Sequence, residues 1–194
     1  MPRLEPVPDR DTTLGTKIAM FFTKRRFVKM TGRAPAAMLE PLQMYAHIPK
    51  LLQGYGRLEQ AVAGLELLDK RHRALAELKA ATTTRCEYCI DLGSQVARGW
   101  GLSDDELLAL PNFREAACFS DVDKLVLEYA AAMSRTPVEV GDELFAALER
   151  HFDTAQLVEL THVIALENLR ARFNLALGIG AAGFSEGAVC ARPD

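Results

Sequence analysis

The sequence lacks the features that mark membrane, exported and nucleic-acid-binding proteins. Its most apolar late stretch, residues 175–184, is ten residues long and holds three glycines, whereas a bilayer-spanning helix needs about 18 apolar residues or more. Residues 1–10 carry charges and three prolines where a signal peptide has an apolar core. Basic residues cluster only at positions 24–29, so there is no broad surface for neutralising phosphates. We therefore expect no export, no membrane partner and no nucleic-acid partner.

Cysteine is also scarce, and the chain has little net charge. The four cysteines lie at positions 86, 89, 118 and 190, too few for a disulfide framework in a chain of this length. With 194 residues, a net charge of −3 and 49% hydrophobic residues, the composition is that of a globular protein with one sizeable core. We expect a cytoplasmic protein with a single CxxC motif.

Proline and glycine occur only nine and thirteen times, and between them apolar residues recur at spacings of three and four. No segment keeps the alternation typical of a strand, so the pattern predicts an all-α, compact multi-helix bundle. We expect one domain over residues 1–194, with a core from about 15 to 184 and frayed tails at 1–12 and 185–194. The expected helices are 16–30, 35–47, 49–67, 69–84, 87–100, 104–110, 121–134, 142–151 and 154–177.

The last expected helix is apolar around most of its circumference. Such a helix must be buried on several sides, either in the centre of the domain or between subunits. This pattern favours a homo-oligomer.

The motif that carries chemistry is Cys86-Glu87-Tyr88-Cys89, at the junction of two expected helices. Within a regular helix, β-carbons three residues apart are about 5–6 Å apart, too far for a disulfide. We therefore place Cys86 at a helix N-terminus, where non-helical backbone lets it pair with Cys89. Backbone N–H groups and the helix dipole favour a thiolate there. The motif predicts a reactive, redox-capable dithiol.

Two other interpretations of the cysteine pair stay open. A zinc site would need two further ligands, and neither the four histidines nor Cys118 lies at a finger-like spacing from the pair, so we assign no metal and no other cofactor. The cysteines could also be buried and inert, packing as small apolar side chains.

The stretch DKRHRALAELKAATTTRCEYCIDLGSQVARGWGLSDDEL, residues 69–107, resembles the carboxymuconolactone decarboxylase and alkyl hydroperoxidase D superfamily. A looser resemblance extends over residues 30–180. It implies an all-helical fold that assembles as trimers or hexamers. It also implies a redox pair in which Cys89 attacks a peroxide and Cys86 resolves the resulting sulfenic acid as a disulfide.

The family's proton relay, however, is missing. The relay uses a glutamate twelve residues before the first cysteine and a histidine four residues after the second, and these positions hold Ala74 and Gly93. Glu77 lies one turn from Ala74 on the same helix face, although a surface glutamate is the plainer interpretation. His162 and Glu167 on the last helix are further candidates, although a lone histidine there more often belongs to the core.

The resemblance therefore implies a thiol-dependent peroxidase or disulfide oxidoreductase, weakened by the absent relay. It would act on a small peroxide or disulfide and draw electrons from a thiol donor. Two alternatives remain. One is a non-catalytic, redox-sensitive binding protein. The other is a decarboxylase-like enzyme acting on a carboxylated lactone, for which Arg170 and Arg172 are the available cations.

Overall fold

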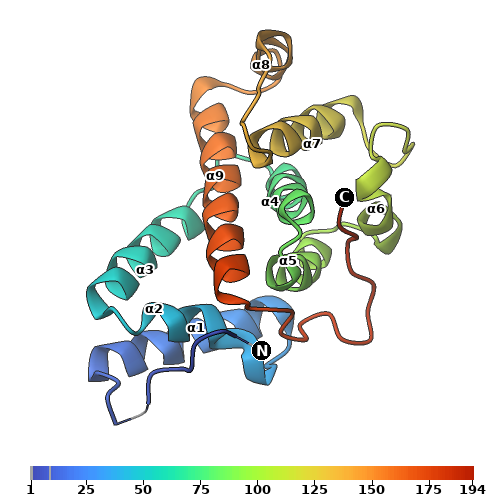
Figure 1. Cartoon of the computed structure of the whole chain (residues 1–194). Helices are drawn as coiled ribbons and strands as arrows, with labels where there is room; N and C mark the ends of the chain where they lie inside the picture. The colour runs from blue at the N-terminus through green and yellow to red at the C-terminus, as the bar shows by residue number, and fades with distance from the viewer. Residues whose placement is uncertain (1, 9) are drawn as a thin grey trace.

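The computed structural model describes residues 2–8 and 10–194, and in this part of the chain every regular element is helical, as predicted. The longest of these helices, α9 (Thr154–Leu177), runs through the middle of the fold with other helices on both sides of it, as Figure 1 shows. The helices are α1 (Leu14–Thr31), α2 (Glu40–Tyr45), α3 (Pro49–Ala63), α4 (Lys70–Thr84), α5 (Glu87–Gly99), α6 (Asp104–Ala109), α7 (Asp121–Ser134), α8 (Asp142–Glu149) and α9 (Thr154–Leu177).

Local capping chemistry explains most of the boundaries. Ser103 and Glu106 form a capping box at the start of α6, Ser120 and Asp123 form one at α7, and Asp153 begins α9 in the same way. In each box two side chains satisfy backbone N–H groups that the first helical turn leaves free. At the other end, α1 and α9 stop at glycines in the left-handed conformation.

Two predicted helices differ from the structure. Residues 35–47, expected as one helix, form a 3₁₀ turn (Ala36–Leu39) followed by the short α2, and Pro41 lies in the first turn of α2, a position that proline tolerates. Helix α3 ends at Ala63 rather than near Leu67, because Gly64 follows it. These changes leave the order of the helices as predicted.

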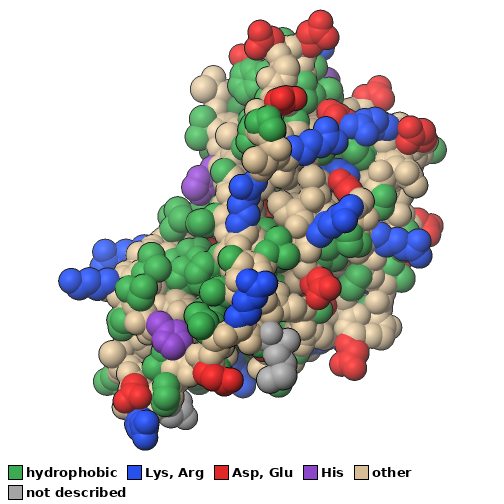
Figure 2. Space-filling model, viewed as in Figure 1, with side chains coloured by type: hydrophobic (Ala, Val, Ile, Leu, Met, Phe, Trp, Pro, Cys, Tyr) green, Lys and Arg blue, Asp and Glu red, His purple; other side chains and the backbone are tan. Residues whose placement is uncertain are grey.

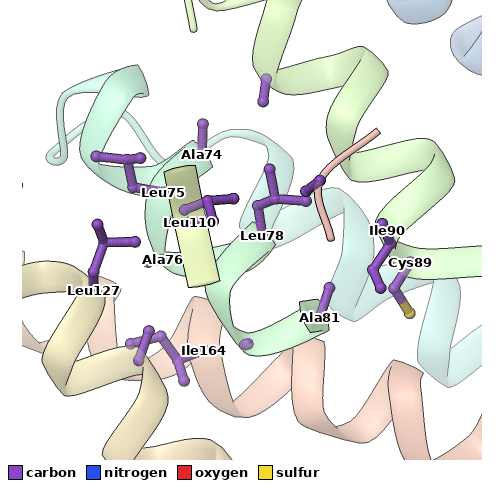
Figure 3. Close-up of a cluster of buried hydrophobic side chains, with 14 of the residues drawn as sticks. Ala74, Leu75, Ala76, Leu78, Ala81, Cys89, Ile90, Leu110, Leu127 and Ile164 are labelled. Atoms are coloured by element: carbon purple, nitrogen blue, oxygen red, sulfur yellow. The ribbon is translucent and has the colours of Figure 1, made fainter. Parts of the chain in front are cut away.

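Helix α4 forms the centre of the core, packed against α5, α7 and α9. Its alanines at 74, 76, 80 and 81 are almost fully buried, and their small side chains let neighbouring helices approach closely. Leu75 and Leu78 of α4 meet Leu127 of α7 and Ile164 of α9 in the cluster of Figure 3. Burying each such leucine or isoleucine contributes about 1.5–3 kcal/mol.

Helix α9 runs through the middle of the fold, and most of its apolar circumference is covered, as the sequence predicted. Leu160, Val163 and Ile164 are fully buried, whereas Val158, Leu169 and Leu175 remain exposed. None of the described helices combines the length and the apolar composition needed to cross a membrane.

The C-terminal segment differs from the frayed tail that the sequence suggested. The carboxylate of Asp91 on α5 accepts four hydrogen bonds from the backbone N–H groups of residues 182–185, at 2.7–3.0 Å. Further along, Ser94 accepts from Ala191, and the buried ammonium of Lys79 donates to Asp194 at 2.7 Å. The segment therefore lies along α5, and its Phe184 packs edge-on against Phe27 of α1.

Candidate functional site

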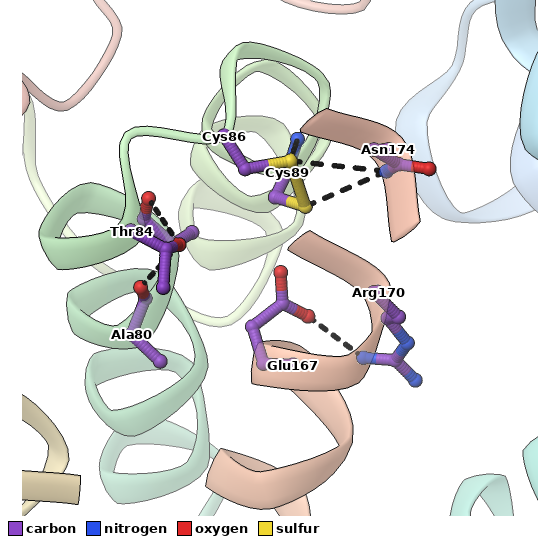
Figure 4. The surroundings of a disulfide bond; sticks show 8 residues. Ala80, Thr84, Cys86, Cys89, Glu167, Arg170 and Asn174 are labelled. Carbon is purple, nitrogen blue, oxygen red and sulfur yellow. Dashed lines mark hydrogen bonds and ion pairs between the residues drawn. A yellow bond between two sulfur atoms is a disulfide. The ribbon is translucent and has the colours of Figure 1, made fainter. Parts of the chain in front are cut away.

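The two cysteines of the CxxC motif lie at the start of α5, as the sequence predicted. Arg85 takes a left-handed conformation with φ 58° and ends α4, and Cys86 is the extended N-cap of α5. The sulfur of Cys86 accepts a hydrogen bond from the backbone N–H of Cys89 at 3.3 Å. A disulfide joins the two residues, as Figure 4 shows.

The two sulfurs differ in what they face. Cys86 is fully buried, whereas Cys89 keeps 6% of its surface exposed and lines a cavity of about 630 Å³ that Cys86 does not line. The amide of Asn174 on α9 donates toward both sulfurs, at 3.8 Å to Cys86 and 3.7 Å to Cys89. Access to the redox pair from the cavity therefore runs through Cys89.

The cavity wall is largely apolar and aromatic. The ring of Tyr45 stacks between those of Tyr55 and Phe173, with centroids 4.5 and 4.1 Å away. Side chains from α1, α3, α4, α5 and α9 complete the wall, among them Phe22, Phe27, Leu52, Leu78, Leu92, Val96 and Trp100. Such a wall suits a molecule with an apolar body.

Three arginines line the cavity, and two of them, Arg170 and Arg73, are paired with carboxylates; the third is Arg26 of α1. Arg170 donates two hydrogen bonds to Glu59, at 2.9 and 2.7 Å, and a third to Glu167 at 2.9 Å. Arg73 contacts Glu77 at 3.3 Å. The cavity thus holds these charges in mutually compensated groups.

Burial shifts the acidity of several of these groups. Desolvation raises the pKa of Glu167 to about 7, against the attraction of Arg170, and the nearby carboxylates Glu77 and Glu59 add to the rise. Desolvation likewise raises the pKa of Tyr55 far above its ordinary value. For Glu59 burial acts in the same direction, but the ion pair and hydrogen bonds with Arg170 outweigh it and lower the pKa.

The positions of the missing relay also lie in this wall. Ala74 and Gly93 both line the cavity and bring no titratable group to it. A Cβ atom at position 93 would lie 3.1 Å from the Cδ1 atom of Leu78, which explains why glycine fits there. The space is taken by a neighbouring helix.

Of the other residues that the sequence suggested for the site, some line the cavity and others do not. Glu167 and Glu77 line the cavity, so the interpretation of Glu77 as a surface residue was wrong, whereas His162 does not line it. Arg170 lies in the wall, but Arg172 is exposed and donates to Thr136. Among the described residues no group of three or more His, Cys, Asp or Glu side chains is arranged to hold a metal ion.

Sequence reasoning missed Asn174, Glu59 and the aromatic stack. A signal for Asn174 was present: Glu167, Arg170 and Asn174 follow each other at spacings of three and four on a mostly apolar helix, which places three polar groups on one buried face. Glu59 had no such signal, because its partner Arg170 lies 111 residues away.

An all-helical fold with a buried CxxC pair opening on an apolar cavity defines a class of thiol-containing helical-bundle proteins. The model of the carboxymuconolactone decarboxylase family matches residues 49–132. The uncharacterized protein YnjA of Escherichia coli K12 is 40% identical over 151 residues, which covers 75% of this chain and 81% of YnjA. The chain belongs to the carboxymuconolactone decarboxylase and alkyl hydroperoxidase D superfamily.

Another relative shares part of the sequence, and solved structures share the fold. YdfG of Bacillus subtilis is 28% identical over 116 residues, 59% of this chain and 79% of its own. An alkylhydroperoxidase AhpD core protein from Ralstonia eutropha JMP134 superposes with a TM-score of 0.73 at 16% identity, covering 93% and 92% of the two chains. The debrominase Bmp8 gives 0.75 at 18% identity, covering 92% and 91%. At such identities these structures show a shared fold.

Proposed function

We propose that this protein is a thiol-dependent peroxidase whose attacking group is Cys89 and whose resolving group is Cys86. The observation that carries the proposal is the unequal exposure of the two sulfurs. Cys89 lines the cavity, and Cys86 is fully buried behind it within disulfide reach. A substrate in the cavity meets only the Cys89 sulfur.

The reaction begins with the reduced dithiol. The Cys89 thiolate attacks the terminal oxygen of a hydroperoxide, the O–O bond breaks, and the alkoxide takes a proton to leave as an alcohol. Cys89 is thereby oxidised to a sulfenic acid. The Cys86 thiol then attacks that sulfur and water leaves, which gives the disulfide. A thiol donor of two electrons restores the dithiol.

The site favours the thiolate of Cys89 by two contacts. Cys89 lies in the first turn of α5, where free N–H groups and the helix dipole stabilise negative charge. The N–H donor of Asn174 points to the same sulfur. The aromatic wall and the paired charges support an organic hydroperoxide with an apolar body as the substrate.

The cavity offers less support for a decarboxylase. Such an enzyme needs cations free to hold carboxylates. Arg170 is already bonded to Glu59 and Glu167, and Arg73 to Glu77, which leaves Arg26 as the other arginine in the wall. A shared fold alone does not select among chemistries, and the solved structures similar to this one include a debrominase. The geometry of the two cysteines is therefore the main support for the peroxidase proposal.

The test is turnover of cumene hydroperoxide with a dithiol reductant. We expect the wild type to reduce the hydroperoxide over many turnovers and Cys89→Ser to lose this activity fully. Cys86→Ser should consume one equivalent of hydroperoxide and then stop. Equal loss in the two variants with no single turnover by Cys86→Ser would contradict the assigned roles. Absence of peroxide consumption by the reduced wild type would leave a redox-sensitive binding protein as the better description.

We also propose that the protein is a cytoplasmic homo-oligomer. Large apolar side chains stay exposed on α1 and at the start of α3, namely Leu14, Ile18, Phe21, Phe22, Ile48 and Leu51. Figure 2 shows apolar side chains gathered over α3 and the helices next to it. Exposed apolar patches of this kind mark contacts with another chain. A cytoplasmic setting supplies the thiol donor.

A further inference from the structure

Glu167 is a buried carboxyl group that the peroxidase proposal has not yet used. Only 6% of the residue is exposed, and it lines the same cavity as Cys89. Glu167 and Asn174 lie two turns apart on one face of α9, and Asn174 contacts both sulfurs. Figure 4 shows the carboxyl group of Glu167 pointing toward the disulfide.

The hydrogen bonds of Glu167 leave part of the carboxyl group free. The Nε and Nη2 groups of Arg170 donate hydrogen bonds to Glu59. Only its Nη1 group donates to Glu167, at Oε2. Oε1 of Glu167 accepts no hydrogen bond from the described residues. It is also not one of the fully buried side-chain atoms that lack a hydrogen-bond partner, so it keeps some accessible surface. One oxygen is therefore held by Arg170, and the other is available to a molecule in the cavity.

The charges around Glu167 keep it able to exchange a proton near neutral pH. On its own helix it faces Arg170, which Glu59 of α3 also neutralises. Helix α4 contributes Glu77 with its partner Arg73, and α5 contributes Cys89. The other charged or titratable groups in the cavity wall are Arg26 of α1, Tyr45 of α2, Tyr55 of α3 and Tyr88 of α5. Two carboxylates thus share one guanidinium in a desolvated place. Desolvation raises the pKa of Glu167 to about 7, Glu77 and Glu59 add to the rise, and Arg170 opposes it, whereas the pKa of Glu59 is lowered.

We propose that Glu167 is the proton-transfer group of this site and replaces the relay that Ala74 and Gly93 cannot provide. The hydroperoxide would lie against both Oε1 of Glu167 and the sulfur of Cys89, with Oε1 within reach of the thiol proton. The carboxylate takes the thiol proton of Cys89, which gives the attacking thiolate, and returns this proton to the alkoxide released from the broken O–O bond. The thiol proton thereby ends on the product alcohol, and Glu167 is again ionised. This inference rests on the proposed peroxidase function.

The matched experiment compares two buried glutamates of α9. Glu159 is as buried as Glu167 but bonds the backbone N–H of Leu67 and does not line the cavity. We measure the second-order rate constant of the reduced protein with cumene hydroperoxide from pH 5 to 9, after checking the fold by circular dichroism. The wild-type rate should rise through a midpoint near pH 7, because the ionised carboxyl group is the base.

For Glu167→Gln we expect a loss of rate at pH 7 of at least about a hundredfold, the lower end of general-base contributions. The midpoint of the rate profile should move toward the ordinary thiol pKa of about 8.5. Glu159→Gln should keep the wild-type midpoint. An unchanged midpoint in Glu167→Gln would overturn the inference while leaving the peroxidase function intact. A wild type without peroxide consumption would instead overturn the function itself.

A second variant keeps the inference testable if Glu167→Gln does not fold. Glu59→Gln leaves Glu167 in place, removes one of the two carboxylates that share Arg170 and frees the guanidinium for the other. The pKa of Glu167 should fall, and the midpoint of the rate profile should move to lower pH. A midpoint that stays in place in Glu59→Gln would count against Glu167 as the titrating group.

Discussion

The amide nitrogen of Asn174 lies 3.7 Å from the sulfur of Cys89, at the distance of a hydrogen bond to sulfur. The two residues are 85 positions apart in the sequence, and they meet because α5 and α9 both pack against α4. The contact joins the redox pair to the polar face of the central helix.

Replacing this amide should make Cys89 less acidic. A hydrogen bond to a charged group contributes about 1.5–3 kcal/mol, and a tenfold change in thiolate population corresponds to about 1.4 kcal/mol. Asn174→Leu should therefore raise the pKa of Cys89 by about one unit or more, as followed by thiolate absorbance against pH. Asn168→Leu is the matched control, because Asn168 is a buried amide on α9 that bonds Ser134 instead. Equal thiol pKa values in the two variants would contradict the role of Asn174.

A histidine at position 93 would crowd the side chain of Leu78. Because a Cβ atom there would lie 3.1 Å from Leu78, Gly93→His alone should destabilise the fold by about 1–3 kcal/mol in urea unfolding. Leu78→Ala should relieve the crowding, so the double variant should be more stable than the sum of the two single changes. It should also react faster with peroxide at pH 7 than Leu78→Ala alone, because an imidazole one turn from Cys89 can serve as a base. A double variant no faster than Leu78→Ala would show that position 93 offers no productive geometry.

The sequence allowed the local part of this site to be predicted, and not the tertiary part. The placement of Cys86 as an N-cap follows from the geometry that a CxxC disulfide needs, and the start of α6 follows from the capping residues Ser103 and Glu106. These signals lie within a few residues of each other. Arg170 illustrates the opposite case: its sequence position gives no hint that Glu59 neutralises it, since this pairing depends on how α3 packs beside α9.

The C-terminal segment shows the same limit. Its composition predicts fraying, but the carboxylate of Asp91 on α5 accepts four hydrogen bonds from the backbone N–H groups of residues 182–185. No local pattern in the segment predicts its hydrogen bonds with Asp91, which lies about 90 positions earlier in the sequence. Tertiary contacts decide its conformation.

Arg71 of α4, Glu106 of α6 and Asp123 of α7 form an ion-pair cluster. This cluster should make the free energy of unfolding depend on pH in the acid range. Burial alone raises the pKa of Asp123, but hydrogen bonds from Arg71 and Ser120 outweigh it and hold the pKa below the ordinary 3.8. Hydrogen bonds from Arg71 lower the pKa of Glu106 in the same way, against burial. Because both folded pKa values are depressed, the stabilisation is complete above the unfolded values and is lost as the pH falls below about 4.

The variant Asp123→Asn tests this cluster. It should lower the free energy of unfolding by about 2 kcal/mol at pH 7, less than for a fully buried pair because Arg71 is 32% exposed. It should also flatten the acid dependence. Asp121→Asn, in the same first turn but exposed, should change stability by under about 1 kcal/mol. Urea unfolding between pH 3 and 7 gives both quantities, and an equally steep acid dependence in Asp123→Asn would contradict the assignment.

The oligomeric state is tested by light scattering. We expect a mass that is a multiple of 21.4 kDa at micromolar concentration, because exposed Phe21 and Phe22 of α1 would be covered by a second copy. Phe21→Asp should lower that mass, whereas Val138→Asp, at an exposed apolar residue far from α1 in the sequence, should not. A wild type of 21.4 kDa would refute the prediction.

The central claim is that Cys86 and Cys89 form a reversible disulfide when a peroxide is reduced at Cys89. The most direct measurement counts free thiols in a Cys118→Ser, Cys190→Ser background, which removes the two cysteines outside the pair, and locates the bonds by peptide mass. One equivalent of cumene hydroperoxide should remove both remaining thiols, join Cys86 to Cys89 and release one equivalent of alcohol, and a dithiol should restore them. Thiols that survive the peroxide, or a sulfenic acid trapped on Cys86 rather than Cys89 in the matching single-cysteine proteins, would contradict the account.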